Sequence, residues 1–367
     1  AHLFSRLGFC WAGSPAANEL TRWADELLPV TGALPDGERM RVEVLAMQAA
    51  DTFETTAAHL QRARELVVAA DAAGDAHTAA CARLVVVIGQ GWRGEDLAGA
   101  AALAAEARAA LVAAGDGFWA AEATCCQGLV ALRGLDLAGG VALLEQALAE
   151  HRAVGSPVGV ARVLFFLGAS QHLAGDPGSA RRAFAEVRRL LAGGRVTTWL
   201  RATTALGHAC LADGDPAAAV DAFREAHTRA TEAGDRLIAV QALGGVAAAV
   251  RSRDGDRLAA PLLLAAVHEA LAADEDYEAA LAATSLADVV AGQGRPSDAA
   301  LLLGAAEAVP APAGVRLAPS LPAGEAGALA ERLDAALGEA PCARLRADGA
   351  LLGLAAAVAA TTEPAPH

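Results

Sequence analysis

The sequence predicts an all-α fold, in which about seven antiparallel helix pairs stack into a right-handed superhelical solenoid that ends in a C-terminal helical cap. Three observations support this prediction. Apolar and polar residues hardly ever alternate with the period of two that strands require, and alanine, leucine, glutamate and arginine favour helices. Turn residues recur with a period of about 40 positions. A second series of turns falls between them, so each repeat holds two helices.

The turns define the repeat. The main series has gaps of 40, 40, 39, 41 and 39 residues, and it comprises Asp96, Asp136, Asp176, Asp215, Asp256 and Arg295. The interleaved series comprises Gly74-Asp75, Gly115-Asp116, Gly155-Ser156, Gly193-Gly194 and Gly234-Asp235. Glycine adopts the left-handed conformation that ends a helix, and aspartate or serine caps the next helix. The turns therefore predict where each helix begins and ends.

Small and large residues keep the same period. Gly168 and Gly207 precede their turns by eight residues, and Phe184 and Phe223 follow them by eight. Small residues let two helices approach closely, and a large residue fills the adjacent groove. The pattern resembles the tetratricopeptide repeat with a longer period, and the residues that match its spacings are Leu164, Leu167, Gly168, Gly175-Asp176, Ala180 and Phe184.

The C-terminal part strengthens this resemblance. Residues 299–309 (AALLLGAAEAV) and 330–360 resemble the end of the tetratricopeptide region in multidomain actinobacterial transcriptional regulators, of the SARP type or the large ATP-binding LuxR type. In that family a stretch like Leu303–Glu307 ends the array, and one like Ala336–Glu339 opens the capping helices. The resemblance implies that the helical array receives a signal, while a nucleotide-binding switch and a DNA-binding domain lie elsewhere in the regulator.

The chain divides into five predicted parts. Residues 1–74 are N-terminal helical repeats, and residues 75–309 are six tetratricopeptide-like repeats. A proline-rich loop follows at 310–324, then the helical cap at 325–360 and a flexible tail at 361–367. The chain begins with Ala1 rather than methionine, and no basic region followed by an apolar segment marks a signal peptide. We therefore expect a fragment of a longer protein.

Composition and charge exclude several functions. All 29 basic residues are arginine, against 43 acidic residues, for a formal net charge of −14. Without lysine, the chain can form neither a Walker-type phosphate loop nor a lysine Schiff base. The acidic balance argues against direct binding of nucleic acid or of anionic membranes. No uncharged apolar run is long enough to span a bilayer.

The cysteines favour a cytoplasmic location. They lie in apolar helical stretches without the CxxC spacing of a zinc knuckle. We interpret them as small buried thiols in a reducing compartment. The six are Cys10, Cys81, Cys125, Cys126, Cys210 and Cys342.

Two patterns could carry chemistry, and we assign neither to a functional site. Residues 89–94 fit the GxGxxG pattern of a dinucleotide-binding loop, but Gly94 and Asp96 fall in register with the other inter-helix turns. His77 and Cys81 are four residues apart on one helix, and no third ligand stands nearby in the sequence. We therefore predict no enzyme activity, no catalytic residue, no metal site and no cofactor.

The most informative candidates lie on the predicted concave face. In tetratricopeptide arrays the first helix of each pair lines this face, and the resemblance places exposed positions 14, 11, 7 and 4 residues before each turn residue. In the middle two repeats these positions hold a cationic patch. Phe165 and Trp92 would add an apolar wall to it, and the alternative for each is packing within the array. The patch comprises Arg162, His172, Arg201, Thr204 and His208.

Two interpretations of this patch stay open. Guanidinium groups in a groove bind carboxylate or phosphate, which predicts a site for a small anionic effector or an acidic peptide or protein segment. Alternatively, the arginines pair with glutamates of neighbouring helices. The sequence thus predicts a sensor module of a regulator, with other domains of that regulator as partners. A general protein–protein scaffold is the alternative function, and apolar terminal repeats would allow a homodimer.

Overall fold

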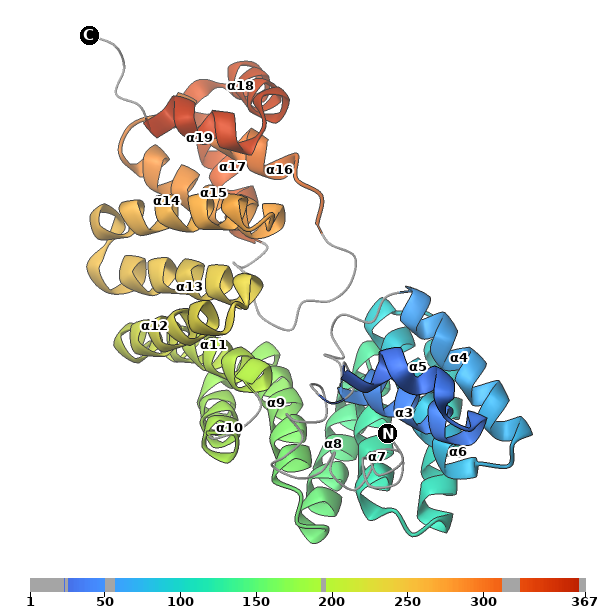
Figure 1. Cartoon of the computed structure of the whole chain (residues 1–367). Coiled ribbons are helices and arrows are strands. Elements are labelled where there is room, and N and C mark those ends of the chain that lie inside the picture. The colour runs from blue at the N-terminus through green and yellow to red at the C-terminus, as the bar shows by residue number, and fades with distance from the viewer. Residues whose placement is uncertain (1–22, 24–25, 50–56, 193–195, 312–323, 363–367) are drawn as a thin grey trace. The chain divides into compact units, whose positions relative to one another are not determined.

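The computed structural model describes residues 23, 26–49, 57–192, 196–311 and 324–362 (Figure 1), and these ranges contain helices and no strand. Helices α3 to α16 follow one another as seven pairs, and α17 to α19 follow at the C-terminus. The predicted all-α helical-repeat fold is therefore confirmed. Most of the predicted proline-rich loop and tail, and much of the N-terminal region, lies outside the described residues.

The helices have similar lengths along the array. In chain order the elements are η1 (Leu28–Ala33), α3 (Asp36–Ala49), α4 (Ala57–Ala72), α5 (Ala76–Arg93), α6 (Leu97–Ala113), α7 (Gly117–Arg133), α8 (Leu137–Ala153), α9 (Pro157–Leu173), α10 (Pro177–Leu190), α11 (Val196–Ala212), α12 (Pro216–Ala233), α13 (Arg236–Asp254), α14 (Asp256–Ala272), α15 (Asp276–Gly292), α16 (Pro296–Glu307), α17 (Gly324–Leu337), α18 (Glu339–Leu352) and α19 (Leu354–Thr362).

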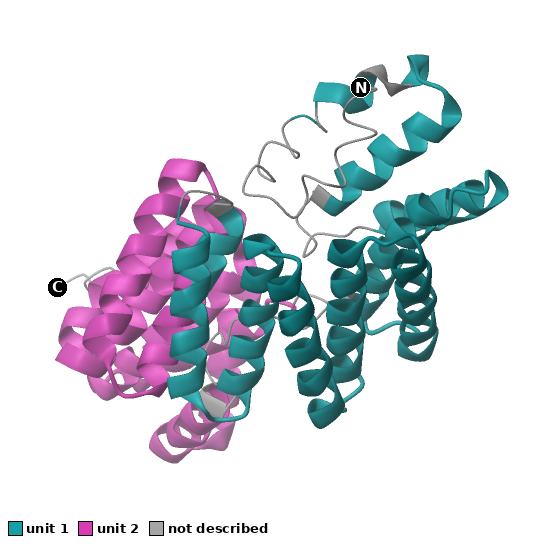
Figure 2. Cartoon of the chain, turned by 90° about the horizontal axis from the view of Figure 1, so that it is seen from below, with its two compact units in different colours: residues 1–202 teal, residues 203–367 magenta. Residues whose placement is uncertain are grey.

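The chain forms two compact units, Ala1–Ala202 and Thr203–His367 (Figure 2). In the first unit, each helix from α4 to α10 contacts the next along the chain, and α12 to α16 do so in the second. First helices of successive pairs also contact each other, as α5, α7 and α9 do. Helix α7 consequently has ten buried residues, whereas α6 and α8 have four each. The first helices therefore carry most of the core.

The inter-helix turns have the predicted cap chemistry. The φ angle of Gly234 is 75°, in the left-handed region that ends a helix, and the carboxylate of Asp235 accepts a bond from the N–H of Ile238. The turns before α14 and α16 differ, because neither Gly255 nor Arg295 provides a side-chain cap. Side chains that cap helices in the same way as Asp235 are those of Asp75, Asp96, Asp116, Asp136, Ser156, Asp176 and Asp215.

The small and large residues that recur with the repeat contact each other, as the sequence predicts. A Cβ atom added to Gly168 would lie 2.9 Å from Phe184 Cε1, and one added to Gly207 would lie 2.7 Å from Phe223 Cε1. Real Cβ atoms do not approach other atoms this closely, so glycine is needed where these rings pack. Both phenylalanine side chains are buried. The repeat therefore depends on close helix contact at these positions.

The C-terminal helices pack onto the last repeat. Helices α16 and α18 cross at Gly304 and Gly349, where an added Cβ would overlap the backbone of the facing helix. Beside this crossing, Arg346 donates hydrogen bonds to both carboxylate oxygens of Glu307, with the Arg346 Nη2 to Glu307 Oε2 distance at 2.6 Å. Helices α17 to α19 thus cover one end of the second unit, as expected of a cap.

Candidate functional site

A buried cluster of charged and polar groups lies in the first unit, where α7, α8 and α9 contact one another. Arg162 of α9 donates a hydrogen bond to Glu122 of α7, with 2.6 Å between Nη1 and Oε2. The other carboxylate oxygen of Glu122 lies 3.4 Å from Nε2 of His151, on α8. The side chains of Glu122 and His151 are 2% and 0% exposed, whereas that of Arg162 is 22% exposed. We call these three residues the Glu122 cluster.

The repeat itself builds this cluster. Glu122 and Arg162 occupy the same repeat position, fourteen residues before Asp136 and Asp176. Equivalent positions of α7 and α9 face each other because these helices are in contact. Arg162 therefore pairs with a glutamate of a neighbouring helix, which is the second of the two interpretations that the sequence left open.

The imidazole ring of His151 fits only because residue 159 is a glycine. A Cβ atom on Gly159 would overlap the His151 ring, so the missing side chain leaves room for the imidazole. On another side, the ring of Phe118 lies 5.5 Å from that of His151. The imidazole is thus enclosed by an aromatic ring, a glycine backbone and one carboxylate.

Burial decides the charges of the Glu122 cluster. It lowers the pKa of His151, and the nearby Glu122 carboxylate offsets this only in part. Burial also acts to lower the pKa of Arg162, but nearby groups, with Glu122 foremost among them, together outweigh it and the pKa is raised. Oε1 of Glu122 and both ring nitrogens of His151 are buried without a hydrogen-bond partner among the described residues. The cluster is therefore an arginine–glutamate pair beside a neutral histidine.

The other predicted residues of α9 differ in exposure. His172 is half-buried, its Nδ1 has no hydrogen-bond partner among the described residues, and burial lowers its pKa. Phe165 is 7% exposed and packs against Phe166 and Phe184, with ring centres 5.6 and 5.8 Å away. The expectation that Phe165 is exposed as a groove wall is wrong, because its ring fills space between α9 and α10.

The predicted residues of α11 are also mostly enclosed. Thr204 is 3% exposed, so the expectation of an exposed position is wrong there too. Arg201 and His208 are half-buried, and the His208 ring lies 4.9 Å from that of Phe223. The side chain of Trp92, in α5, lies outside the residues that the structure describes. A joint site of Arg162, Arg201 and the two histidines stays a prediction.

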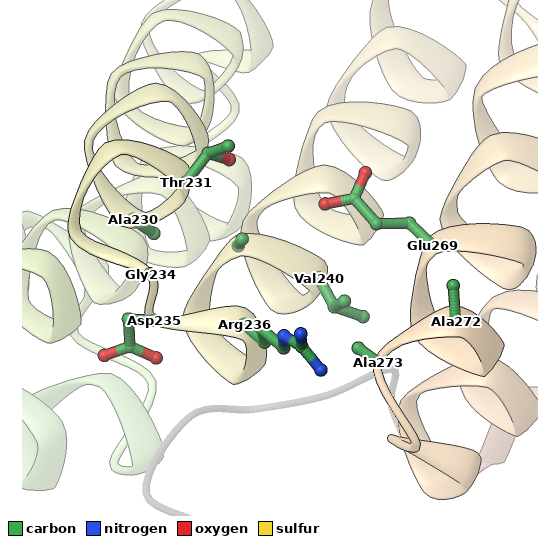
Figure 3. A pocket seen from close by; sticks show the side chains of 10 residues that line it. Ala230, Thr231, Gly234, Asp235, Arg236, Val240, Glu269, Ala272 and Ala273 are labelled. Atoms are coloured by element: carbon green, nitrogen blue, oxygen red, sulfur yellow. The ribbon is translucent and has the colours of Figure 1, made fainter.

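A pocket of about 350 Å³ lies within the second unit, between the end of α12, the start of α13 and the end of α14 (Figure 3). Figure 3 shows Arg236 and Glu269 reaching into this space from different helices. Glu269 also lies 3.2 Å from Nε2 of His227. The pocket is lined by Ala230, Thr231, Gly234, Asp235, Arg236, Ala239, Val240, Glu269, Ala272 and Ala273.

Sequence reasoning missed this pocket, although the repeat holds a signal for it. Ala230 stands fifteen residues after its turn residue, where other repeats have Leu111, His151, Leu191 and Leu271. A small residue at a position that otherwise holds a large one leaves space between helices. Aligning the repeats position by position would have revealed the gap.

The structure also places the cysteines and the earlier metal candidates. Cys81, Cys125, Cys126, Cys210 and Cys342 are free and buried, while Cys10 lies outside the described residues. Nε2 of His77 lies 2.9 Å from the Asp116 carboxylate. Within the described part of the chain, no group of three or more histidine, cysteine or acidic side chains could hold a metal ion, and no helix is long and apolar enough to cross a membrane.

Comparisons with known proteins identify the fold. No protein-family model matches the sequence, and no curated protein matches it either. Among solved structures, a Rap protein complexed with the competence and sporulation factor matches with a TM-score of 0.59 at 11% identity, over 98% of each chain. The apo form of RapI matches with a TM-score of 0.56 at 10% identity, over 92% of this chain and 86% of that one.

A third solved structure is matched across half of its own length. It is a signal transduction ATPase with numerous domains (STAND) protein with a tetratricopeptide repeat sensor, from Pyrococcus horikoshii. Its TM-score is 0.55 at 12% identity, over 96% of this chain and 50% of that one. At these identities the likeness is one of fold. The chain is similar to helical-repeat proteins that resemble the tetratricopeptide architecture.

Proposed function

We propose that the chain is a non-catalytic sensor and interaction module of a transcriptional regulator, and that it binds an anionic group on the face formed by its first helices. The fold supports an interaction scaffold, since one similar structure is a complex with the competence and sporulation factor and another contains a tetratricopeptide repeat sensor. The regulator context rests on the sequence resemblance of residues 299–309 and 330–360.

The proposal rests mainly on the observation that Arg162 is held in place and yet partly exposed. Its Nη1 is fixed by the buried Glu122 carboxylate, while 22% of its side chain stays exposed. A guanidinium has five N–H donors in a planar fork, so one bond to Glu122 leaves donors for a second anion. Because the partner holds it in place, little side-chain freedom is lost when that anion binds.

The spacing along α9 favours one class of anion. Arg162 and His172 are ten residues apart, which is about 15 Å at the rise of an α-helix. A small effector in contact with Arg162 cannot also reach His172, but an extended chain can. We therefore favour an acidic peptide or protein segment over a small anionic effector, and Arg201, which is also in the first unit, stays a proposed contact.

The remaining parts of the proposal concern the setting. We propose a cytoplasmic location, which the buried free thiols support. The proposed partners are other domains of the same regulator. The module itself is proposed not to bind nucleic acid or membranes. We also propose that a second copy of the chain could cover the apolar faces of the terminal repeats, which would give a homodimer. A scaffold with no effector remains the second candidate function, because the observed fold serves it equally.

The experiment is a fluorescence anisotropy titration of a labelled oligoglutamate peptide with the full chain. The test variant is Glu122→Gln with Arg162→Gln, which removes one charge of each sign and leaves the net charge unchanged. Glu186→Gln with Arg189→Gln is the matched control, since it removes an exposed pair of α10 and likewise leaves the net charge unchanged. We expect binding that only the test variant weakens, by about tenfold. Equal affinities for all three proteins would refute the role of Arg162.

A further inference from the structure

The pocket of the second unit is lined mainly by small residues, with a few charged and polar ones. Four of its lining residues are alanines, contributed by α12, α13 and α14 and the turn that follows α14, and Val240 adds an apolar wall. Its volume of about 350 Å³ falls at the lower end of small-molecule sites. The pocket therefore suits a small ligand with an apolar part.

Three charged residues line this pocket: Asp235, whose carboxylate caps α13, and the oppositely charged Arg236 and Glu269. Arg236 is exposed at the start of α13, and among the described residues its guanidinium has no hydrogen-bond or ion-pair partner. Glu269 projects from α14 and is half-buried. No ion pair joins these two side chains (Figure 3), so Arg236 is available to an anionic group, while Glu269 already contacts His227 and keeps acceptor sites for a cationic group.

The neighbouring polar groups add acceptors on the Glu269 side. The Thr231 hydroxyl donates to the backbone oxygen of His227 at 2.8 Å, which leaves its lone pairs free to accept. The imidazole of His227 contacts Glu269 through Nε2 alone, at 3.2 Å and 3.4 Å from the two carboxylate oxygens. Glu269 keeps further lone pairs for another donor, because a carboxylate has about four acceptor sites.

We propose that this pocket binds a small zwitterion of the aliphatic amino-acid class. The ligand carboxylate pairs with the Arg236 fork, its ammonium group donates to Glu269, and its side chain packs against Val240 and the alanines. This site is separate from the Arg162 face of the first unit. It adds a second, small-molecule input to the module, and it stands whether or not an acidic segment binds α9.

Isothermal titration calorimetry with the full chain tests this assignment. The probes are leucine, 4-methylpentanoate, which lacks the ammonium group, and 3-methylbutylamine, which lacks the carboxylate. We expect saturable binding of leucine, and at least about tenfold weaker binding of each analogue because one charge-assisted contact is lost. Absence of saturable leucine binding at millimolar concentration would overturn the proposal, as would equal binding of all three probes.

Variants locate the binding. Arg236→Gln and Ala230→Leu are each expected to weaken leucine binding by about tenfold or more, the first through the lost charge and the second by filling the pocket. Arg257→Gln is the matched control, because Arg257 is an exposed arginine of α14 outside the pocket. Leucine binding that survives both test variants unchanged would place the site elsewhere and overturn the assignment.

Discussion

Removing Arg162 should expose how much the first unit depends on the Glu122 cluster. In Arg162→Met, the apolar stem is kept but Glu122, which is 2% exposed, loses its cation. Two unit charges about 4 Å apart attract by about 4 kcal/mol at an effective dielectric constant of about 20. Breaking a buried pair typically costs about 3–5 kcal/mol, and the partial exposure of Arg162 places the expected loss at about 3 kcal/mol.

The assay is urea unfolding followed by the far-ultraviolet circular dichroism of the helices. Glu122→Gln combined with Arg162→Met should recover about 2 kcal/mol of the loss, because no charge is then left buried. Arg189→Met, which breaks a solvent-exposed pair within α10, should change the free energy of unfolding far less than Arg162→Met does. The reasoning is refuted if Arg162→Met costs no more than Arg189→Met, or if the double variant is as unstable as the single one.

Three further predictions follow from burial and close contact. Burial lowers the pKa of His151 in the folded state, so below about pH 6.5 the unfolded chain binds more protons than the folded chain does. The free energy of unfolding should therefore fall as the pH drops below this value, as measured by urea titrations at successive pH values. His151→Leu should reduce this fall. Gly349→Ala should lower the melting temperature, because its Cβ would overlap α16, whereas Gly327→Ala on α17 meets nothing within 4 Å and should raise it slightly. Burial raises the pKa of Cys126 to about 12, so iodoacetamide should label it only after denaturation, as read by peptide mass spectrometry; rapid labelling of the native chain would contradict its burial.

The repeat made the fold predictable. Turn residues such as Asp136 and Asp176 mark the starts of second helices because a short carboxylate side chain caps the backbone N–H groups there. The recurring glycine and phenylalanine positions could be predicted for a similar reason. Gly168, for example, has no Cβ atom and so leaves room for the Phe184 ring. Local rules repeated at a fixed period leave little for long-range contacts to decide.

The candidate sites were less predictable, because they depend on which side chains stand at equivalent repeat positions and on how deeply each side chain is buried. Position counting found Arg162 and left open whether it binds an anion or pairs with a glutamate of a neighbouring helix; its partner is Glu122, at the same position of the preceding repeat. Phe165 was assigned to a groove wall, although a first helix contacts its neighbours on several sides and buries that face. The pocket around Arg236 arises from an alanine that replaces larger residues, a difference that only a comparison between repeats reveals.

Hydrogen exchange with and without the oligoglutamate peptide tests the central claim most directly, because it reports where an acidic segment binds. The proposal predicts slower exchange on peptide addition in α9, which carries Arg162 and His172, and none of this protection when Glu122→Gln and Arg162→Gln are combined. Protection confined to helices away from α9, or protection that persists in the double variant, would contradict the assignment of the first-helix face as the binding surface.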